Sequence, residues 1–152
     1  MAKSPALLAA LQKVPLFGGL SPNQLQRLFG ICQQESYVEG AALCRTGADS
    51  DRMFVLLSGS VEIRSETDTP LMSQSAITTI GESGMLTGEP RSATVVAEGA
   101  LSVLVIDRHP FMQLMQEDPS LATRFYRNVM TILRQKLISS NRRIDQLLQN
   151  QA

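Results

Sequence analysis

Residues 81–94 read Gly-Glu-Ser-Gly-Met-Leu-Thr-Gly-Glu-Pro-Arg-Ser-Ala-Thr and lie between two segments of strand-like sequence. Gly88 and Pro90 both stop a helix, so Glu82–Thr87 has room for only one or two helical turns. A helix this short leaves most of its amide N–H groups without internal partners. The stretch therefore predicts a short helix between two strands, with unpaired donors at its N-terminus.

The side chains of this stretch suit an anion and a sugar. Gly81 opens the helix N-terminus, where an anion can bind, and Arg91 offers a guanidinium that can pair with a phosphate through two N–H groups. Ser92 adds a hydroxyl, and the Glu82 carboxylate can accept hydrogen bonds from ribose hydroxyls. The same residues would also fit an ordinary loop with an exposed Glu82–Arg91 ion pair. Their chemistry alone leaves both interpretations open.

Short apolar runs broken by glycine extend on both sides of this stretch, from about residue 33 to residue 107. Many short strands with glycine turns and no alternation of strands and helices favour a jelly-roll β-barrel. The polar stretch 66–75 is interpreted as a break. The expected strands are 36–38, 42–45, 53–57, 61–65, 76–80, 92–98 and 101–106.

Helical sequence flanks the barrel at both ends. Ser21, Pro22 and Gln24 form a capping box at a helix start, and the pattern Leu25, Leu28, Phe29, Cys32 continues that helix. We expect a further short helix over 110–117 and a long one from Asp118 to about Gln149. The prediction is one mainly β domain over 1–152, with N-terminal helices in 1–32, the barrel in 33–107 and C-terminal helices in 108–152.

Composition argues against several classes of function. Fourteen basic and fourteen acidic residues give a net charge of zero, whereas a nucleic-acid-binding domain is usually basic. No apolar run reaches the ~18 residues of a membrane span, and the N-terminus is not typical of a signal peptide. Cys32 and Cys44 are expected to be buried thiols in a reducing cytoplasm. With His109 as the single histidine, we expect no metal site and no catalytic triad.

The motifs resemble those of a known family. Gly-Glu-x-Gly-x-Leu followed by Pro-Arg-Ser-Ala-Thr closely resembles the phosphate-binding cassette of the cyclic nucleotide-binding domain family, which includes the catabolite activator protein and the regulatory subunits of protein kinase A. Gly47–Asp51 with Gly59-Ser60-Val61, and Val14–Phe17 near the N-terminus, resemble further family motifs. The resemblance covers nearly the whole chain. Because the sequence ends at Ala152, we expect a stand-alone domain without a helix-turn-helix.

The resemblance implies which residues bind a ligand. Glu82 would bind the ribose 2′-hydroxyl, Arg91 and Ser92 would bind the cyclic phosphate, and Ile63 would contact the base or simply belong to the core. The chain lacks the family's Gly-x-Gly-x-x-Phe turn before Gly81, which shortens the expected rim of the pocket. The implied ligand-binding set is Gly81, Glu82, Ser83, Gly84, Met85, Leu86, Arg91, Ser92, Ala93, Ile63, Ser140 and Asn141.

The long C-terminal helix carries two apolar stripes. One stripe has the alternating spacing of four and three that is typical of a coiled coil, and a second, Ala122, Phe125, Val129 and Ile132, is expected to pack on the barrel. The first stripe predicts a parallel homodimer, although both stripes could also pack within one chain. The six basic residues of the helix are interpreted as a solvated face: Arg124, Arg127, Arg134, Lys136, Arg142 and Arg143. The coiled-coil stripe, called the seam below, is Tyr126, Met130, Leu133, Leu137, Ser140, Ile144 and Leu147.

These expectations favour a regulatory sensor that binds a cyclic nucleotide and transmits binding through its C-terminal helix. The residues do not separate cAMP from cGMP, and cAMP is the favoured ligand. A ligand-free dimerisation module of the same fold is the alternative, as is a transcription regulator that acts through a partner. The expected partners are a second copy of the chain and an unidentified effector protein, with neither a membrane nor direct nucleic-acid contact. No catalytic constellation is visible, so we do not expect an enzyme.

Overall fold

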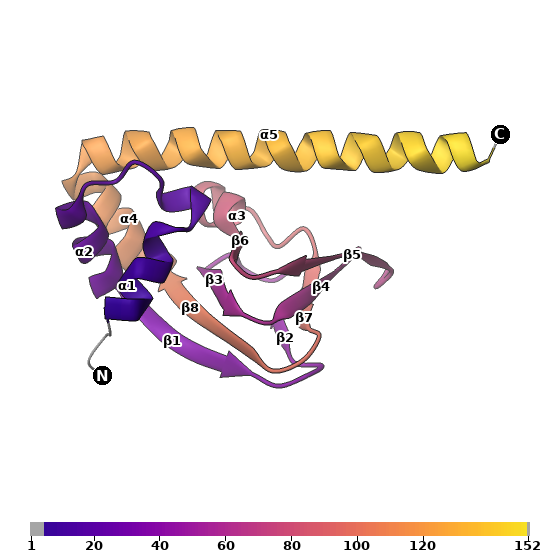
Figure 1. Ribbon diagram of the computed structural model, residues 1–152, viewed down its shortest axis with the longest axis horizontal. Helices are drawn as coiled ribbons and strands as arrows, with labels where there is room; N and C mark the ends of the chain where they lie inside the picture. The colour runs from indigo at the N-terminus through magenta and orange to yellow at the C-terminus, as the bar shows by residue number, and fades with distance from the viewer. Residues whose placement is uncertain (1–4, 152) are drawn as a thin grey trace.

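The computed structural model describes residues 5–151 and shows two four-stranded antiparallel sheets flanked by helices (Figure 1). The order is β1-β8-β3-β6 in one sheet and β2-β7-β4-β5 in the other. This is the expected jelly roll. The strands are β1 (Cys32–Tyr37), β2 (Ala42–Cys44), β3 (Arg52–Ser58), β4 (Ser60–Arg64), β5 (Pro70–Ser75), β6 (Thr78–Ile80), β7 (Thr94–Ala97) and β8 (Leu101–Asp107).

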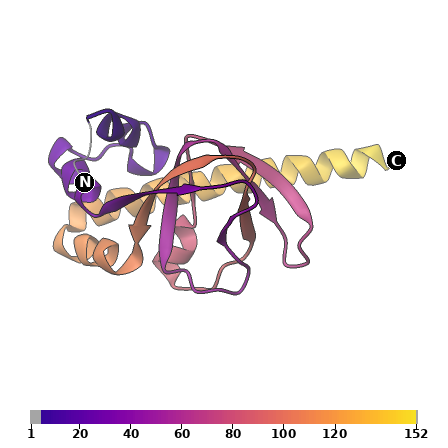
Figure 2. The ribbon, with the colours of Figure 1, turned by 90° about the horizontal axis from the view of Figure 1, so that it is seen from below.

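The helices lie at the two ends of the sequence and between β6 and β7. Figure 2 shows the N-terminal helices gathered at the end of the β-roll where the long helix begins. Residues 1–4, which begin the expected N-terminal helical region, lie outside the described residues. The helices are α1 (Pro5–Gln12), the 3-10 helix η1 (Pro15–Phe17), α2 (Pro22–Gly30), α3 (Glu82–Thr87), α4 (Arg108–Glu117) and α5 (Pro119–Asn150).

The expected start of α2 is confirmed, but its expected end is wrong. The Ser21 side chain accepts a hydrogen bond from the Gln24 amide, and the Gln24 side chain accepts one from the Ser21 amide. The helix ends at Gly30, and Cys32 is the first residue of β1, where it pairs with Ile106. Tertiary pairing with β8 therefore overrides the helical spacing that links Cys32 to Phe29.

The polar stretch 66–75 is not a break, because Pro70–Ser75 forms β5 and pairs with β4. This strand lies at the edge of its sheet and alternates exposed with half-buried residues. An edge strand tolerates polar side chains and a proline at its first position. The expected strand 76–80 is correspondingly reduced to Thr78–Ile80.

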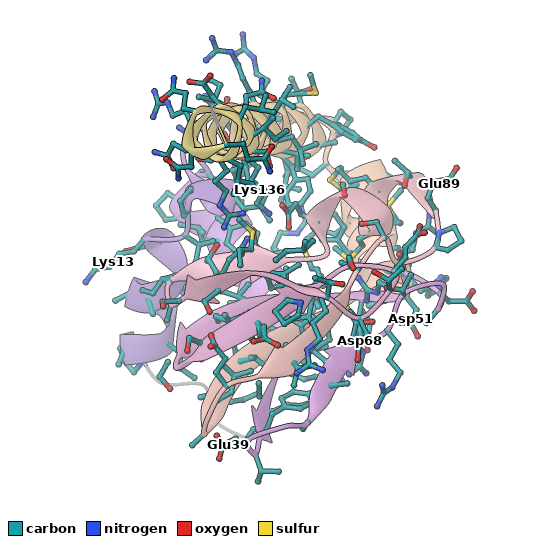
Figure 3. All side chains as sticks on the ribbon, turned by 90° about the vertical axis from the view of Figure 1, so that its right-hand side faces the viewer. Lys13, Glu39, Asp51, Asp68, Glu89 and Lys136 are labelled. Carbon is teal, nitrogen blue, oxygen red and sulfur yellow. The ribbon has the colours of Figure 1, made fainter. Side chains whose placement is uncertain are left out.

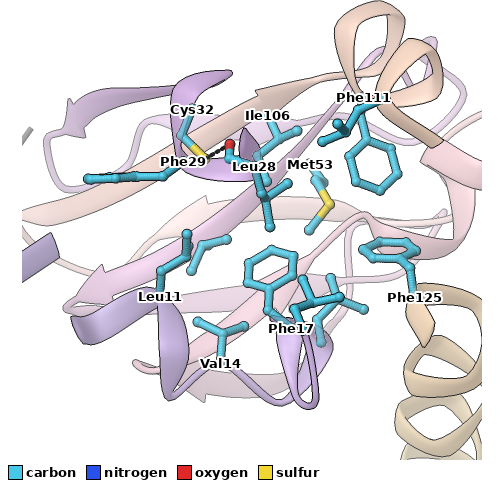
Figure 4. Packing of buried hydrophobic residues seen from close by; sticks show 14 of the residues in the cluster. Leu11, Val14, Phe17, Leu28, Phe29, Cys32, Met53, Ile106, Phe111 and Phe125 are labelled. Atoms are coloured by element: carbon cyan, nitrogen blue, oxygen red, sulfur yellow. Dashed lines mark hydrogen bonds between the residues drawn. The ribbon is translucent and has the colours of Figure 1, made fainter. Parts of the chain in front are cut away.

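A cluster of three phenylalanines fixes the start of α5 on the rest of the domain (Figure 4). The Phe125 ring lies 4.6 Å from the Phe111 ring and 6.4 Å from the Phe17 ring, measured between centroids. All three side chains are fully buried. This cluster joins α5 to α4 and η1, and the expected packing stripe follows it, with Val129 buried and Ala122 and Ile132 half-buried against the same core.

Beyond this cluster, α5 runs across the β-roll, and its C-terminal end extends past it (Figure 1). The helix has 32 residues, or about 48 Å at 1.5 Å per residue. Its buried residues are all in the first third: Leu121, Phe125 and Val129. The apolar seam residues are exposed, with Met130 at 68% and Leu137 at 60%. Within residues 5–151, no helix has the length and apolar character that a membrane span needs.

Candidate ligand-binding site

A cavity of about 600 Å³ lies between the 81–94 stretch, the second sheet and α5. Residues from β4, β5 and β6 line one side, and α5 lines the other. The lining residues that carry the argument below are Ile63, Gln74, Glu82, Arg91, Lys136 and Ser140.

Local sequence explains the shape of the 81–94 stretch. Gly81 precedes α3 with φ +86°, and Gly88 follows it with φ +75°, a backbone region that glycine adopts without strain. A Cβ on Gly81 would also collide with Nη1 of Arg91. Glycine at position 81 therefore both ends the strand and lets the Arg91 guanidinium approach the backbone.

The Gly47–Asp51 motif holds Arg91 in place. The Arg91 amide donates to the Ala48 carbonyl, and the Gly47 amide donates to the Arg91 carbonyl, both at 2.8 Å. The Arg91 Nη2 group donates to the Arg52 carbonyl at 2.5 Å. The side chain is only 7% exposed, and its guanidinium carbon lies 6.0 Å from the centroid of the Phe54 ring. The guanidinium is thus fixed before any ligand binds.

Buried polar atoms without partners gather in this cavity. Within residues 5–151, four buried side-chain N or O atoms lack a hydrogen-bond partner: Nε and Nη1 of Arg91, Oε2 of Glu82 and Oε1 of Gln74. All three residues line the cavity. An unsatisfied buried polar atom costs about 1–3 kcal/mol, and more when it is charged. The cavity therefore suits a ligand that supplies acceptors to Arg91 and a hydroxyl donor to Glu82.

Glu82 is held by the long helix. Its side chain is 3% exposed, and Oε1 accepts a hydrogen bond from Nζ of Lys136 at 2.6 Å. The alternative of an exposed Glu82–Arg91 ion pair is wrong, because both residues are buried and Glu82 pairs with Lys136. Lys136 is not simply part of a solvated face, because its ammonium pairs with the buried Glu82 carboxylate while the side chain stays 39% exposed.

The cavity collects most of the expected ligand-binding residues. Gly81, Glu82, Ser83, Arg91, Ser92, Ala93, Ile63 and Ser140 line it. Ile63 also packs, half-buried, against the core between the sheets, so its role in the core is confirmed, whereas its contact with a base stays a prediction.

Four expected residues are not brought to the lining of this cavity. Gly84 packs closely against Ser50, and Met85 is fully buried in the helical core. Leu86 packs partly buried against that core, and Asn141 is exposed on α5. Successive side chains of an α-helix point about 100° apart around its axis, so α3 cannot present every residue to one cavity.

Several lining residues were not anticipated. Lys136, Ser139 and Ser140 share one face of α5 because they are three and four residues apart, and extending the expected contact at Ser140 by one turn would have found them. Gln74 and Met72 belong to β5, whose polar sequence gave no signal. Cys44 contributes from β2, which pairs with β7 next to Arg91.

The Cys44 thiol gives a direct test of the cavity. Burial raises the pKa of this thiol, and the nearby Arg91 charge opposes that effect. Because the thiolate is the reactive form, we expect Cys44 to alkylate more slowly than an ordinary cysteine and to accelerate as the pH rises above neutral. An anion bound in the cavity should slow the reaction further by covering the thiol and neutralising Arg91. Mass spectrometry after iodoacetamide treatment, with Cys44→Ser as control, measures both effects.

The fold and the cavity define a β-roll domain whose cavity is lined by buried polar atoms without partners. The chain matches the family model of the cyclic nucleotide-binding domain over residues 34–118, and it belongs to that family. Within the described residues, no group of three or more His, Cys, Asp or Glu side chains could hold a metal ion.

Relatives and solved structures agree with this assignment. The chain is 31% identical over 135 residues to glutaminase 1 of Bradyrhizobium diazoefficiens, covering 89% of this chain and 22% of the relative. It superposes on a cyclic nucleotide-binding domain from Methylobacillus flagellatus with a TM-score of 0.78 and 26% identity, over 90% of this chain and 79% of that one. The regulatory domain of Toxoplasma gondii protein kinase A, crystallised with cAMP, gives a TM-score of 0.69 at 21% identity, over 74% and 46%.

The chain spans about a fifth to a third of the length of the first curated relatives that it matches. Those relatives are an enzyme and an ion channel, so domains like this one are found within proteins of different activities.

Proposed function

We propose that this domain binds a cyclic nucleotide, with cAMP favoured over cGMP, and acts as a regulatory sensor without catalysis of its own. The observation that carries the proposal is the set of unpartnered atoms in one cavity, on Gln74, Glu82 and Arg91. The cAMP complex of the similar Toxoplasma regulatory domain supports the choice of cAMP.

The chemistry of each group assigns its role. Nε and Nη1 of Arg91 are unpartnered donors on a positively charged group, and the oxygens of a cyclic phosphodiester are the acceptors that these donors lack. Oε2 of Glu82 is an acceptor that a ribose 2′-hydroxyl can satisfy. Ile63 and Leu133 supply apolar surface on opposite sides of the cavity, between which a base can lie.

Ligand binding should stabilise the folded domain. At a ligand concentration of 100 times the dissociation constant, the free energy of unfolding should rise by about 2.7 kcal/mol. For a domain of this size, that gain corresponds to a rise in Tm of about 5–11 °C. Differential scanning fluorimetry with cAMP, cGMP and 5′-AMP measures it, and 5′-AMP is the control because it lacks the cyclic phosphodiester. No shift with millimolar cAMP or cGMP would favour the ligand-free dimerisation module instead.

The second part of the proposal is a parallel homodimer through α5. The apolar seam residues repeat at coiled-coil spacing from Tyr126 to Leu147 and are exposed in the single chain. A free helix face of about 30 Å with this many large apolar side chains is costly in water. A second copy of the same helix offers the matching seam, so each chain would cover the other.

The seam and the cavity share residues, and this supports transmission of binding through α5. Leu133 and Ser140 belong to the seam and also line the cavity. A ligand that contacts them more favourably in one helix arrangement than in another would shift the dimer toward that arrangement. The downstream effector in this proposal is a protein that responds to the position of α5.

A further inference from the structure

The Lys136–Glu82 ion pair connects α5 to the 81–94 stretch across the ligand cavity. Lys136 is 39% exposed at its side chain, whereas Glu82 is 3% exposed, so the pair lies at the edge of the buried region. Figure 3 shows Lys136 extending from α5 toward the β-roll. The two residues are 54 positions apart in sequence, so the pair forms only when the helix lies over the cavity.

Lys136 follows Asn128 as a polar attachment of α5 to the rest of the domain. The Asn128 side chain donates to the carbonyls of Leu16 and Gly18 at 2.8 and 2.9 Å. Within residues 5–151, the next polar contact along α5 to the rest of the domain joins Lys136 to Glu82. The two residues are eight positions apart, about 12 Å along the helix. Lys136 therefore holds the helix segment that lines the cavity.

The charges around the cavity suit a single anion. The charged lining residues are Glu82, Arg91 and Lys136, which together carry one net positive charge. A cyclic phosphodiester carries one negative charge and matches it. Without Lys136, the buried Glu82 carboxylate would have no positively charged partner, and its negative charge would repel the phosphate.

We infer that Lys136 is a positioning residue that fixes the Glu82 carboxylate for ribose recognition and couples that recognition to α5. Lys136 binds Oε1 of Glu82 and leaves Oε2 directed to the ligand hydroxyl. The inference rests on the proposed cyclic-nucleotide function. The same contact that prepares the ribose site holds the helix, so a change in Glu82 on ligand binding is transmitted directly to α5.

The test is a double-variant cycle with Lys136→Met, Glu82→Gln and the combined variant. Isothermal titration with cAMP should show Lys136→Met binding about 10- to 100-fold more weakly, the range expected for loss of a charge-assisted hydrogen bond. In the Glu82→Gln background, the same substitution should cost less than about 3-fold, because its effect passes through the carboxylate. Lys136→Arg should recover most of the affinity. Arg134→Met removes the same charge from α5 away from the cavity and is the matched control.

Two further readouts separate positioning from a general structural role. The wild-type protein should prefer cAMP over 2′-deoxy-cAMP, and Lys136→Met should reduce that preference. In the unliganded protein, Lys136→Met should lower the Tm by leaving a buried unpaired carboxylate, and adding Glu82→Gln should restore part of the loss.

The outcomes distinguish the two proposals. If the wild-type protein binds neither cAMP nor cGMP, the proposed function fails, whatever the Tm values show about the ion pair. If the wild-type protein binds cAMP and Lys136→Met binds it equally well, the inference about Lys136 is overturned. Equal losses in the wild-type and Glu82→Gln backgrounds would also overturn it, because Lys136 would then act on the ligand directly.

Discussion

Replacing Arg91 with alanine is expected to weaken cyclic-nucleotide binding by roughly 30- to 5,000-fold, which corresponds to about 2–5 kcal/mol for a buried charge that loses its partner. The guanidinium is 7% exposed and is held by the Arg52 carbonyl and the Gly47–Asp51 loop. Two of its donors have no protein partner. The ligand therefore meets a charge that is already desolvated and oriented, which makes the contact strong.

Glu82→Ala should cost less, about 1.5–3 kcal/mol or 10- to 150-fold, the value for a hydrogen bond to a charged group. Its removal also leaves Lys136 unpaired at the cavity, and the added positive charge partly offsets the loss by attracting the phosphate. Isothermal titration ranks the two variants. A larger loss for Glu82→Ala than for Arg91→Ala would contradict the assignment of phosphate to Arg91 and ribose to Glu82.

Two controls accompany the Arg91 variant. Arg91→Lys keeps the charge but loses the planar guanidinium with its fixed Nε and Nη1 donors, so its affinity should lie between those of the wild-type protein and Arg91→Ala. Arg45→Ala removes the same charge from an exposed position outside the cavity and should leave the affinity within about 2-fold. The unliganded Arg91→Ala protein should melt close to the wild-type Tm, because the variant removes two buried unsatisfied donors along with the Arg52 contact.

Placing a glutamate at Leu137 is expected to convert the proposed dimer to a monomer. Leu137 lies in the middle of the seam and is 60% exposed in the single chain. A dimer would bury two such side chains, each worth about 1.5–3 kcal/mol. Their loss should raise the dimer dissociation constant by roughly 150- to 25,000-fold, and the two buried like charges add to that effect.

Sedimentation velocity across micromolar concentrations measures the change. Gln149→Glu is the matched control, since it introduces the same charge on the face of α5 opposite the seam and should remain dimeric. The Leu137→Glu monomer should keep its fold, because the buried anchors of α5 are Leu121, Phe125 and Val129. A wild-type protein that is monomeric at high micromolar concentration would contradict the dimer, as would a Leu137→Glu protein that stays dimeric.

Local features of the fold follow from the sequence alone. Gly81, Gly88 and Pro90 confine α3 to Glu82–Thr87 as predicted, and Ser21 with Gln24 begins α2. The apolar runs between glycines predicted most of the strands. In each case, the deciding interaction lies within a few residues of the chain or in the alternation of side chains along one element.

The secondary-structure predictions were wrong where distant parts of the chain decide the local conformation. The β5 strand has a polar sequence and exists because β4 provides a backbone to pair with. Cys32 continues a helical spacing but pairs with Ile106 of β8 instead. Backbone pairing at an edge needs little apolar surface, so the pattern of side chains does not reveal it.

The same distinction between local sequence and tertiary structure applies to the residues of the site. Glu82 and Arg91 were predicted from one contiguous stretch through its resemblance to the family's phosphate-binding cassette, and the structure places both on the cavity. Tertiary structure decided that Lys136 of α5, and not Arg91, pairs with Glu82, and that Gln74 of β5 completes the cavity. The reason is geometric: Phe125 and Asn128 fix where α5 lies, and only that docking brings a lysine 54 residues away within 2.6 Å of the buried carboxylate.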